Sequence, residues 1–168
     1  MTKINTPPHF FLRLIERADN EEVARVIREV MMEFGAVGEG YSINDPEVDH
    51  MYEAYNGDRS VFFVLCRDHD ILGCGGIGPL KGADEEVCEL RKMYFRPVAR
   101  GLGWGKKMLE RCLDEARQRG YQQCYLETVE RMTQANKLYQ RMGFRRLDTS
   151  MGNTGHGSCD SNYVLDLS

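Results

Sequence analysis

Three glycines lie between an apolar run and a helical pattern in the middle of the chain. Residues 93–95 have the composition of a strand end, and Gly101, Gly103 and Gly105 follow, just where an amphipathic helix begins. Glycines at such a turn let backbone N–H groups approach a ligand closely. The N–H groups of a helix's first turn have no partner within the helix, and the helix dipole favours an anion there. The segment therefore predicts a site for a phosphate or pyrophosphate.

Two general phosphate-binding motifs come close to this segment without matching it. A P-loop has four residues between its first glycine and the Gly-Lys pair, whereas Gly101 and Gly105 enclose three, and Lys107 stands where a magnesium-binding hydroxyl belongs. A dinucleotide fingerprint has the spacing G-x-G-x-x-G, whereas the spacing here is G-x-G-x-G. Glu127 lies near the distance expected of a ribose-binding acid, so a dinucleotide site stays open. A tight turn that binds no ligand is a third possibility.

The elements that must position this turn follow from the hydrophobic pattern. Apolar residues at helical spacing predict four helices, and apolar runs bounded by turn residues predict seven strands. The expected helices cover residues 20–34, 45–55, 104–119 and 133–142. The expected strands cover residues 10–16, 60–67, 71–78, 86–95, 122–128, 144–147 and 163–167. Because several strands follow one another, this order predicts an α/β (α+β) protein with a mixed, mainly antiparallel sheet and helices on its faces.

The strand that leads into the glycine turn changes phase. Leu90 is apolar, but the next apolar side chains on this pattern are Met93 and Phe95, an odd number of residues further on. A change of phase within a period-two strand predicts a β-bulge in this fourth strand. The strand–helix–strand unit over residues 86–128 is expected to form a right-handed parallel crossover.

Composition limits the class of protein. The 168 residues, 42% apolar and 29% charged, predict one domain over residues 1–168. The formal net charge of −4 gives no basic field, so no nucleic-acid partner is expected, and no apolar run approaches a membrane span. The six cysteines form no Cys-x-x-Cys pair and lie mostly in apolar patterns, which predicts reduced, mostly buried thiols in a cytoplasmic protein.

Two motifs together resemble a known family. Arg100-x-x-Gly103-x-Gly105 is similar to the acetyl-CoA signature of the GCN5-related N-acetyltransferases (GNAT), Q/R-x-x-G-x-G/A, and residues 93–97 resemble that family's fourth strand and the turn after it. Residues 135–144 resemble its second motif, A-x-x-L-Y-x-x-x-G-F. The order and separation of the motifs also match. The resemblance implies a GNAT-like sheet of six to seven strands flanked by about four helices, with the bulge in the fourth strand.

The resemblance also implies an activity. It is the transfer of an acetyl group from acetyl-CoA to a primary amine, by direct attack in a ternary complex and without a metal. The acceptor would be a small-molecule or peptide amine, and a homodimer is common in the family. A module of the same fold that senses CoA or a nucleotide without turnover is the alternative.

The resemblance also implies contacts with the cofactor at matching positions of this sequence. The pantetheine arm would pair with Met93, Tyr94 and Phe95, where the bulge leaves backbone groups unpaired, and the Phe95 N–H would polarise the thioester carbonyl. Arg100 would act largely through its backbone. The pyrophosphate would lie on the helix start, formed by Gly101, Leu102, Gly103, Trp104, Gly105 and Lys106. Met132 stands where the family often has a cofactor-binding asparagine, and Asn136 is the expected substitute.

Catalytic roles follow in the same way. Tyr139 matches the tyrosine that often protonates the departing CoA thiolate, although its spacing also suits a packed core aromatic. Glu89 is expected to be the general base, directly or through water, with a plain ion pair to Arg91 as the alternative. Glu127 and His156 are further candidate bases, and His156 could equally be an exposed loop residue. Cys159 is expected to be structural or substrate-lining, because direct transfer needs no nucleophilic thiol.

Substrate specificity is expected from the least regular segments, residues 35–44, 45–55 and 148–160. The first two segments and their flanks are rich in acids, which would suit a basic amine or form an ordinary solvated face. These acids are Glu33, Glu39, Asp45, Glu47, Asp49 and Glu53.

Overall fold

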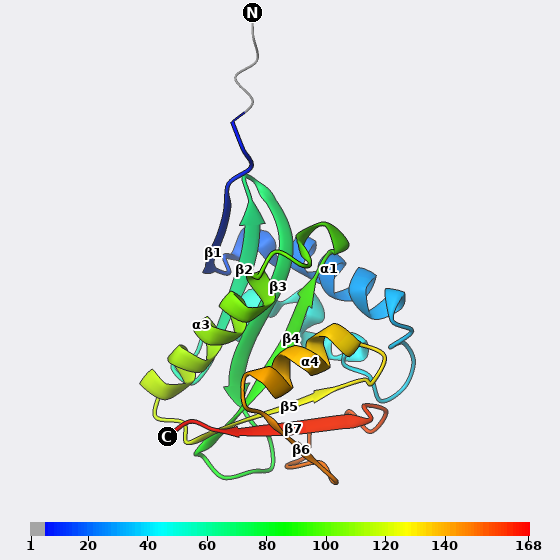
Figure 1. Ribbon diagram of the computed structural model, residues 1–168, viewed down its shortest axis with the longest axis vertical. Coiled ribbons are helices and arrows are strands. Elements are labelled where there is room, and N and C mark those ends of the chain that lie inside the picture. Colours follow the sequence, from blue (N-terminus) through cyan, green and yellow to red (C-terminus); the bar gives the residue numbers. More distant parts are fainter. Residues whose placement is uncertain (1–5) are drawn as a thin grey trace, which may run out of the picture.

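A seven-stranded sheet forms the centre of the computed structural model, which describes residues 6–168 (Figure 1). Residues 1–5 of the expected domain lie outside the described part. The strand order is β1-β2-β3-β4-β5-β7-β6, and only β4 and β5 pair in parallel. The strands are Phe10–Leu14 (β1), Val61–Arg67 (β2), Asp70–Pro79 (β3), Val87–Phe95 (β4), Gln123–Thr128 (β5), Arg145–Leu147 (β6) and Ser161–Asp166 (β7). The predicted mixed, mainly antiparallel sheet is confirmed.

Helices cover both faces of this sheet. They are Asn20–Glu33 (α1), Met51–Ala54 (α2), Trp104–Gln118 (α3) and Thr133–Arg141 (α4). Alternate residues of β2 show the two layers, because Phe62 and Val64 pack with α1 and α2, whereas Phe63 and Leu65 pack with α3 and α4. Within residues 6–168, no helix is long and apolar enough to cross a membrane.

The bulge in the fourth strand is confirmed. On β3, Cys74 and Gly76 are two residues apart, but their partners on β4, Tyr94 and Arg91, are three residues apart. The extra residue bends β4, and Lys92 within the bulge has a positive φ of 50°.

The sheet opens at the parallel pair. Register between β4 and β5 runs only from Val87 with Gln123 to Glu89 with Tyr125. Beyond this point the two strands diverge in Figure 1, and α4 lies across the opening. The fork puts Glu89 at the last paired position of β4 and leaves the bulged end of β4 without a neighbour on this side.

One predicted helix is broken. In place of a continuous helix over 45–55, a 3-10 turn covers Pro46–Asp49 and α2 spans a single turn. His50 between them has φ −138° and ψ 43°, which interrupts the helical hydrogen-bond ladder. The apolar face is nevertheless packed as expected, because Val48, Met51 and Tyr55 are all buried.

Candidate active site

The glycine turn forms an open cradle at the start of α3. Gly101 has φ +74° and Gly103 has φ +87°, conformations that residues with a side chain rarely adopt. A Cβ added at either position would meet nothing within 4 Å among the described residues. No side chain of the described residues caps the helix start, so the N–H groups of its first turn are free to bind an anion.

A groove of about 370 Å³ runs from this cradle between the bulged end of β4 and α4. Most of the predicted cofactor residues line it, together with Leu138 of the second motif and with Thr133 and Gln134, which were not predicted to bind the cofactor. The predicted residues that line it are Met93, Tyr94, Phe95, Arg100, Gly101, Gly103, Gly105 and Lys106. The structure thus brings the two motifs to opposite walls of one groove.

Three predicted cofactor residues lie elsewhere. Leu102 is 55% exposed beside the groove. Trp104 stacks on Phe10, with ring centroids 5.9 Å apart. Asn136 donates to the main-chain carbonyls of Val129 and Met132 and accepts a hydrogen bond from Tyr163, so its amide fixes the start of α4.

The Arg100 side chain positions the end of β4. Its Nε donates to the Phe95 carbonyl oxygen at 2.8 Å, and its guanidinium pairs with Glu33 of α1 at 2.6 Å. These two contacts connect α1, the end of β4 and the glycine turn. The Glu33 carboxylate balances the charge of Arg100.

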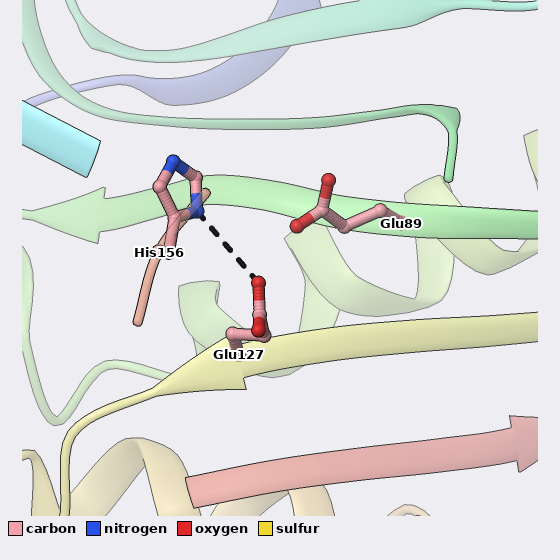
Figure 2. A group of neighbouring side chains, drawn as sticks. All are labelled: Glu89, Glu127 and His156. Carbon is pink, nitrogen blue, oxygen red and sulfur yellow. Dashed lines mark ion pairs between the residues drawn. The ribbon is translucent and has the colours of Figure 1, made fainter. Parts of the chain in front are cut away.

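A second, smaller pocket of about 40 Å³ adjoins the groove, and Tyr94 and Met132 line both. Glu89 from β4, Glu127 from β5 and His156 from the β6–β7 loop line it, and Figure 2 shows these three side chains directed toward one another. One ligand-binding atom of each lies within 4.8 Å of the others. The predicted general base and both further candidates therefore meet in one place, at the fork of the sheet.

His156 is an ion-pair partner rather than an exposed loop residue. Its Nε2 lies 2.9 and 3.0 Å from the two carboxylate oxygens of Asp45, and its Nδ1 lies 3.7 Å from Glu127 Oε1. Asp45 first and Glu127 second raise the pKa of His156 to about 9. The imidazole is thus protonated at neutral pH, which disfavours it as a base.

Glu89 makes the ion pair with Arg91 that was expected as the alternative to a base. Its side chain is 6% exposed and accepts a hydrogen bond from Arg91 Nε at 2.7 Å. Burial is the largest effect on this carboxyl group, and it raises the pKa of Glu89 despite the neighbouring arginine. A carboxylate with a raised pKa, facing a pocket, is suited to accept a proton.

Lys92 is the site residue that sequence reasoning missed. Its side chain is 2% exposed, and its Nζ lies 2.8 Å from Asp45 and 2.5 Å from Glu47. The bulge turns this lysine to the interior. The change of phase after Leu90, which predicted the bulge, was therefore the one feature of the sequence that could have indicated a buried Lys92. Only Asp45 and Glu47 of the acid-rich segments join this network; Asp49 pairs with Arg28 on the exposed surface.

Tyr139 lies in the core, next to the groove rather than in its lining. It is 5% exposed and packs against the rings of Phe144 and Tyr163, at centroid distances of 5.8 and 6.1 Å. Its hydroxyl has no hydrogen bond to any described residue, and burial raises its pKa.

Cys159 lines the small pocket, and burial raises the pKa of its thiol to about 12, so the thiol stays protonated.

Comparison with known proteins agrees with this arrangement. A model of the acetyltransferase (GNAT) family matches residues 15–144. An uncharacterised N-acetyltransferase of Escherichia coli K12, YjgM, is 38% identical over 157 residues, which are 93% of this chain and 94% of YjgM. A GNAT-family acetyltransferase structure from Staphylococcus aureus Mu50 superposes with a TM-score of 0.83 at 21% identity, covering 95% of this chain and 100% of that one. YncA from Salmonella typhimurium, solved with its cofactor acetyl-CoA, superposes with a TM-score of 0.75 at 19% identity, covering 95% of this chain and 94% of YncA. The chain belongs to the GNAT family of acetyltransferases.

Proposed function

We propose that the protein transfers an acetyl group from acetyl-CoA to a primary amine by direct attack in a ternary complex. The observation that supports this most is the pair of adjoining cavities. The groove contains the free N–H groups at the start of α3, and the small pocket contains buried carboxylates. Tyr94 and Met132 line both cavities and form the border between them. A thioester bound in the groove and an amine bound in the pocket would meet at this border.

Acetyl-CoA is the proposed ligand of the groove. The pyrophosphate would lie on the cradle of Gly101 to Lys106, where no Cβ fills the space at Gly101 or Gly103. The pantetheine arm would lie along Met93, Tyr94 and Phe95, since β5 leaves this part of β4 unpaired. Bound acetyl-CoA supplies the activated acyl group, and the Phe95 N–H is proposed to stabilise the oxyanion that forms on its carbonyl.

Glu89 is proposed to remove the proton from the attacking amine. The amine nitrogen forms a bond to the acetyl carbon, the carbon–sulfur bond breaks, and the electron pair of that bond stays on the CoA sulfur. Tyr139 is the proposed donor of the proton that the thiolate takes up. Its phenol is protonated at neutral pH and shares its proton with no described residue. We propose a transfer without a metal, in which Glu89 and Tyr139 supply the base and the acid. We place the enzyme in the cytoplasm, where its six free thiols would stay reduced.

A thermal-shift titration with acetyl-CoA, CoA and NAD, followed by a thiol-release assay on a panel of amines, tests this proposal. A ligand that binds only the folded state raises the unfolding temperature. We expect stabilisation by acetyl-CoA and CoA but not by NAD, with thiol release on at least one amine. Stabilisation without turnover on any amine would favour the CoA-sensing alternative, and stabilisation by NAD alone would favour a dinucleotide site.

A further inference from the structure

Every cation that lines the small pocket is already bound to a carboxylate. Lys92 contacts Asp45 and Glu47, and His156 contacts both oxygens of Asp45. Arg91 donates to Glu89 and to the main-chain carbonyl of Pro79. Within the described residues, the pocket therefore keeps no free cation for an anionic group of a ligand.

The carboxylates are in excess. Four carboxylates, those of Asp45, Glu47, Glu89 and Glu127, face three cations, which leaves one negative charge. Lys92 and His156 balance the charges of Asp45 and Glu47. We therefore assign the remaining charge to Glu89 and Glu127, whose side chains are 6% and 5% exposed.

The hydrogen bonds of these two glutamates show where a donor is missing. Glu89 Oε1 accepts from Arg91, but Glu89 Oε2 accepts from no described residue. The oxygens of Glu127 accept from the neutral hydroxyls of Tyr125 and Thr154. An oxygen of a buried carboxylate that faces a pocket without a donor can accept one from a ligand, and a cationic N–H group makes the strongest such bond.

We propose that the acceptor enters as a monocation, a primary ammonium received by Glu89 and Glu127, with no carboxylate on the carbon next to the nitrogen. This inference rests on the proposed function. The pocket of about 40 Å³ has room for roughly three water-sized groups, so it receives the head of the acceptor. Met31, Ala36, Tyr41 and Val129 also line it, so the first carbons of the acceptor are apolar.

The same arrangement disfavours two other ligands, for different reasons. The carboxylate of a free α-amino acid would enter next to Glu89 and Glu127, where no described cation is free to meet it, and contacts between like charges weaken binding. A divalent metal ion would have to displace the hydroxyls bound to Glu127 and the contact between His156 and Glu127.

Three acceptors that share the isopentylamine skeleton test the charge rule: isopentylamine itself, and leucinamide and leucine, which add a carboxamide or a carboxylate on the carbon next to the nitrogen. The carboxamide of leucinamide has about the size of the carboxylate of leucine but no charge. The comparison is repeated from neutral to alkaline pH, because the three amines differ in the pH at which they lose their proton. We expect kcat/KM for isopentylamine and leucinamide to exceed that for leucine by at least about 100-fold, the range seen when a buried polar mismatch decides selectivity.

Calorimetric binding of isopentylamine to the CoA-bound protein gives a readout that does not depend on turnover. We expect Glu127→Gln, which keeps the shape and one oxygen that can accept a hydroxyl hydrogen bond, to weaken this binding by about tenfold, typical of losing one charge-assisted contact. Glu89→Gln is expected to act in the same direction. Glu21→Gln, at an exposed position of α1 far from the pocket, is the matched control and should bind isopentylamine like the wild type.

Three results would overturn the inference while leaving acetyl transfer intact. The first is a kcat/KM for leucine within about threefold of that for leucinamide. The second is unchanged calorimetric binding of isopentylamine in both glutamine variants. The third is binding of Zn²⁺ or Mg²⁺ that displaces isopentylamine. Failure of the proposed function looks different, because then acetyl-CoA neither stabilises the protein nor releases thiol with any amine.

Discussion

The protonated His156 links two loops, and this link should make stability depend on pH. His156 in the β6–β7 loop holds Asp45, which in turn holds Lys92 of the bulge. The test variant is His156→Gln, which removes the charge but keeps a side chain that can donate a hydrogen bond. The side chain of His156 is only 14% exposed, so solvent screens its ion pairs little.

The magnitude follows from the pKa. In the folded protein the pKa of His156 is raised from 6.5 to about 9. A difference of this size corresponds to roughly 3 kcal/mol of stability. Because the folded-state pKa is the higher one, this contribution is fully present below pH 6.5 and is lost as the pH rises through about 9.

Urea unfolding of wild type and His156→Gln across this pH range measures the effect. We expect the difference in free energy of unfolding between the two proteins to shrink by roughly 3 kcal/mol from below pH 6.5 to above pH 9. His69→Gln is the matched control, because His69 is exposed in the β2–β3 turn and makes no hydrogen bond or ion pair with described residues. Parallel stability curves for wild type and His156→Gln would refute the ion-pair account.

Three further predictions concern the proposed catalytic machinery. Gly103→Leu should destabilise the protein by about 1–2 kcal/mol through its positive φ and weaken acetyl-CoA binding at least about tenfold. Gly120→Leu, with φ +84° at the other end of α3, should show the same destabilisation in urea but normal calorimetric affinity; equal affinity losses would contradict the cradle. Tyr139→Phe should change stability by less than about 0.5 kcal/mol, because no hydrogen bond is lost, while kcat falls about 100-fold. A near-normal kcat would remove Tyr139 as the proton donor. In the pH profile of kcat/KM, activity should fall on the acid side at a pH above 4.5, because burial raises the pKa of Glu89. Glu89→Gln should abolish that limb, and an unchanged limb would assign it to another group.

Features of this protein that depend on local order could be predicted from the amino-acid sequence. Helical spacing located α1, α3 and α4, and the change of phase at Leu90 located the bulge. The positions of Gly101 and Gly103 predicted a turn that only glycine adopts easily. These features depend on residues a few positions apart, so they are visible as spacing. The break in the helix at His50 could not be predicted in this way, because the spacing of apolar residues over 45–55 is the same whether or not the helix is continuous.

The surroundings of the acids in the small pocket depend on contacts between segments that are far apart in the chain. Glu89 and Glu127 meet because β4 and β5 pair for three residues and then separate, and Lys92 turns inward because the bulge gives it a positive φ. Asp45 and His156 are 111 residues apart, and two loops that cover the same end of the sheet bring them together. Loop positions follow no hydrophobic period, so a sequence pattern cannot pair them. The charge balance, and with it the ligand that the pocket can accept, was therefore decided by the fold.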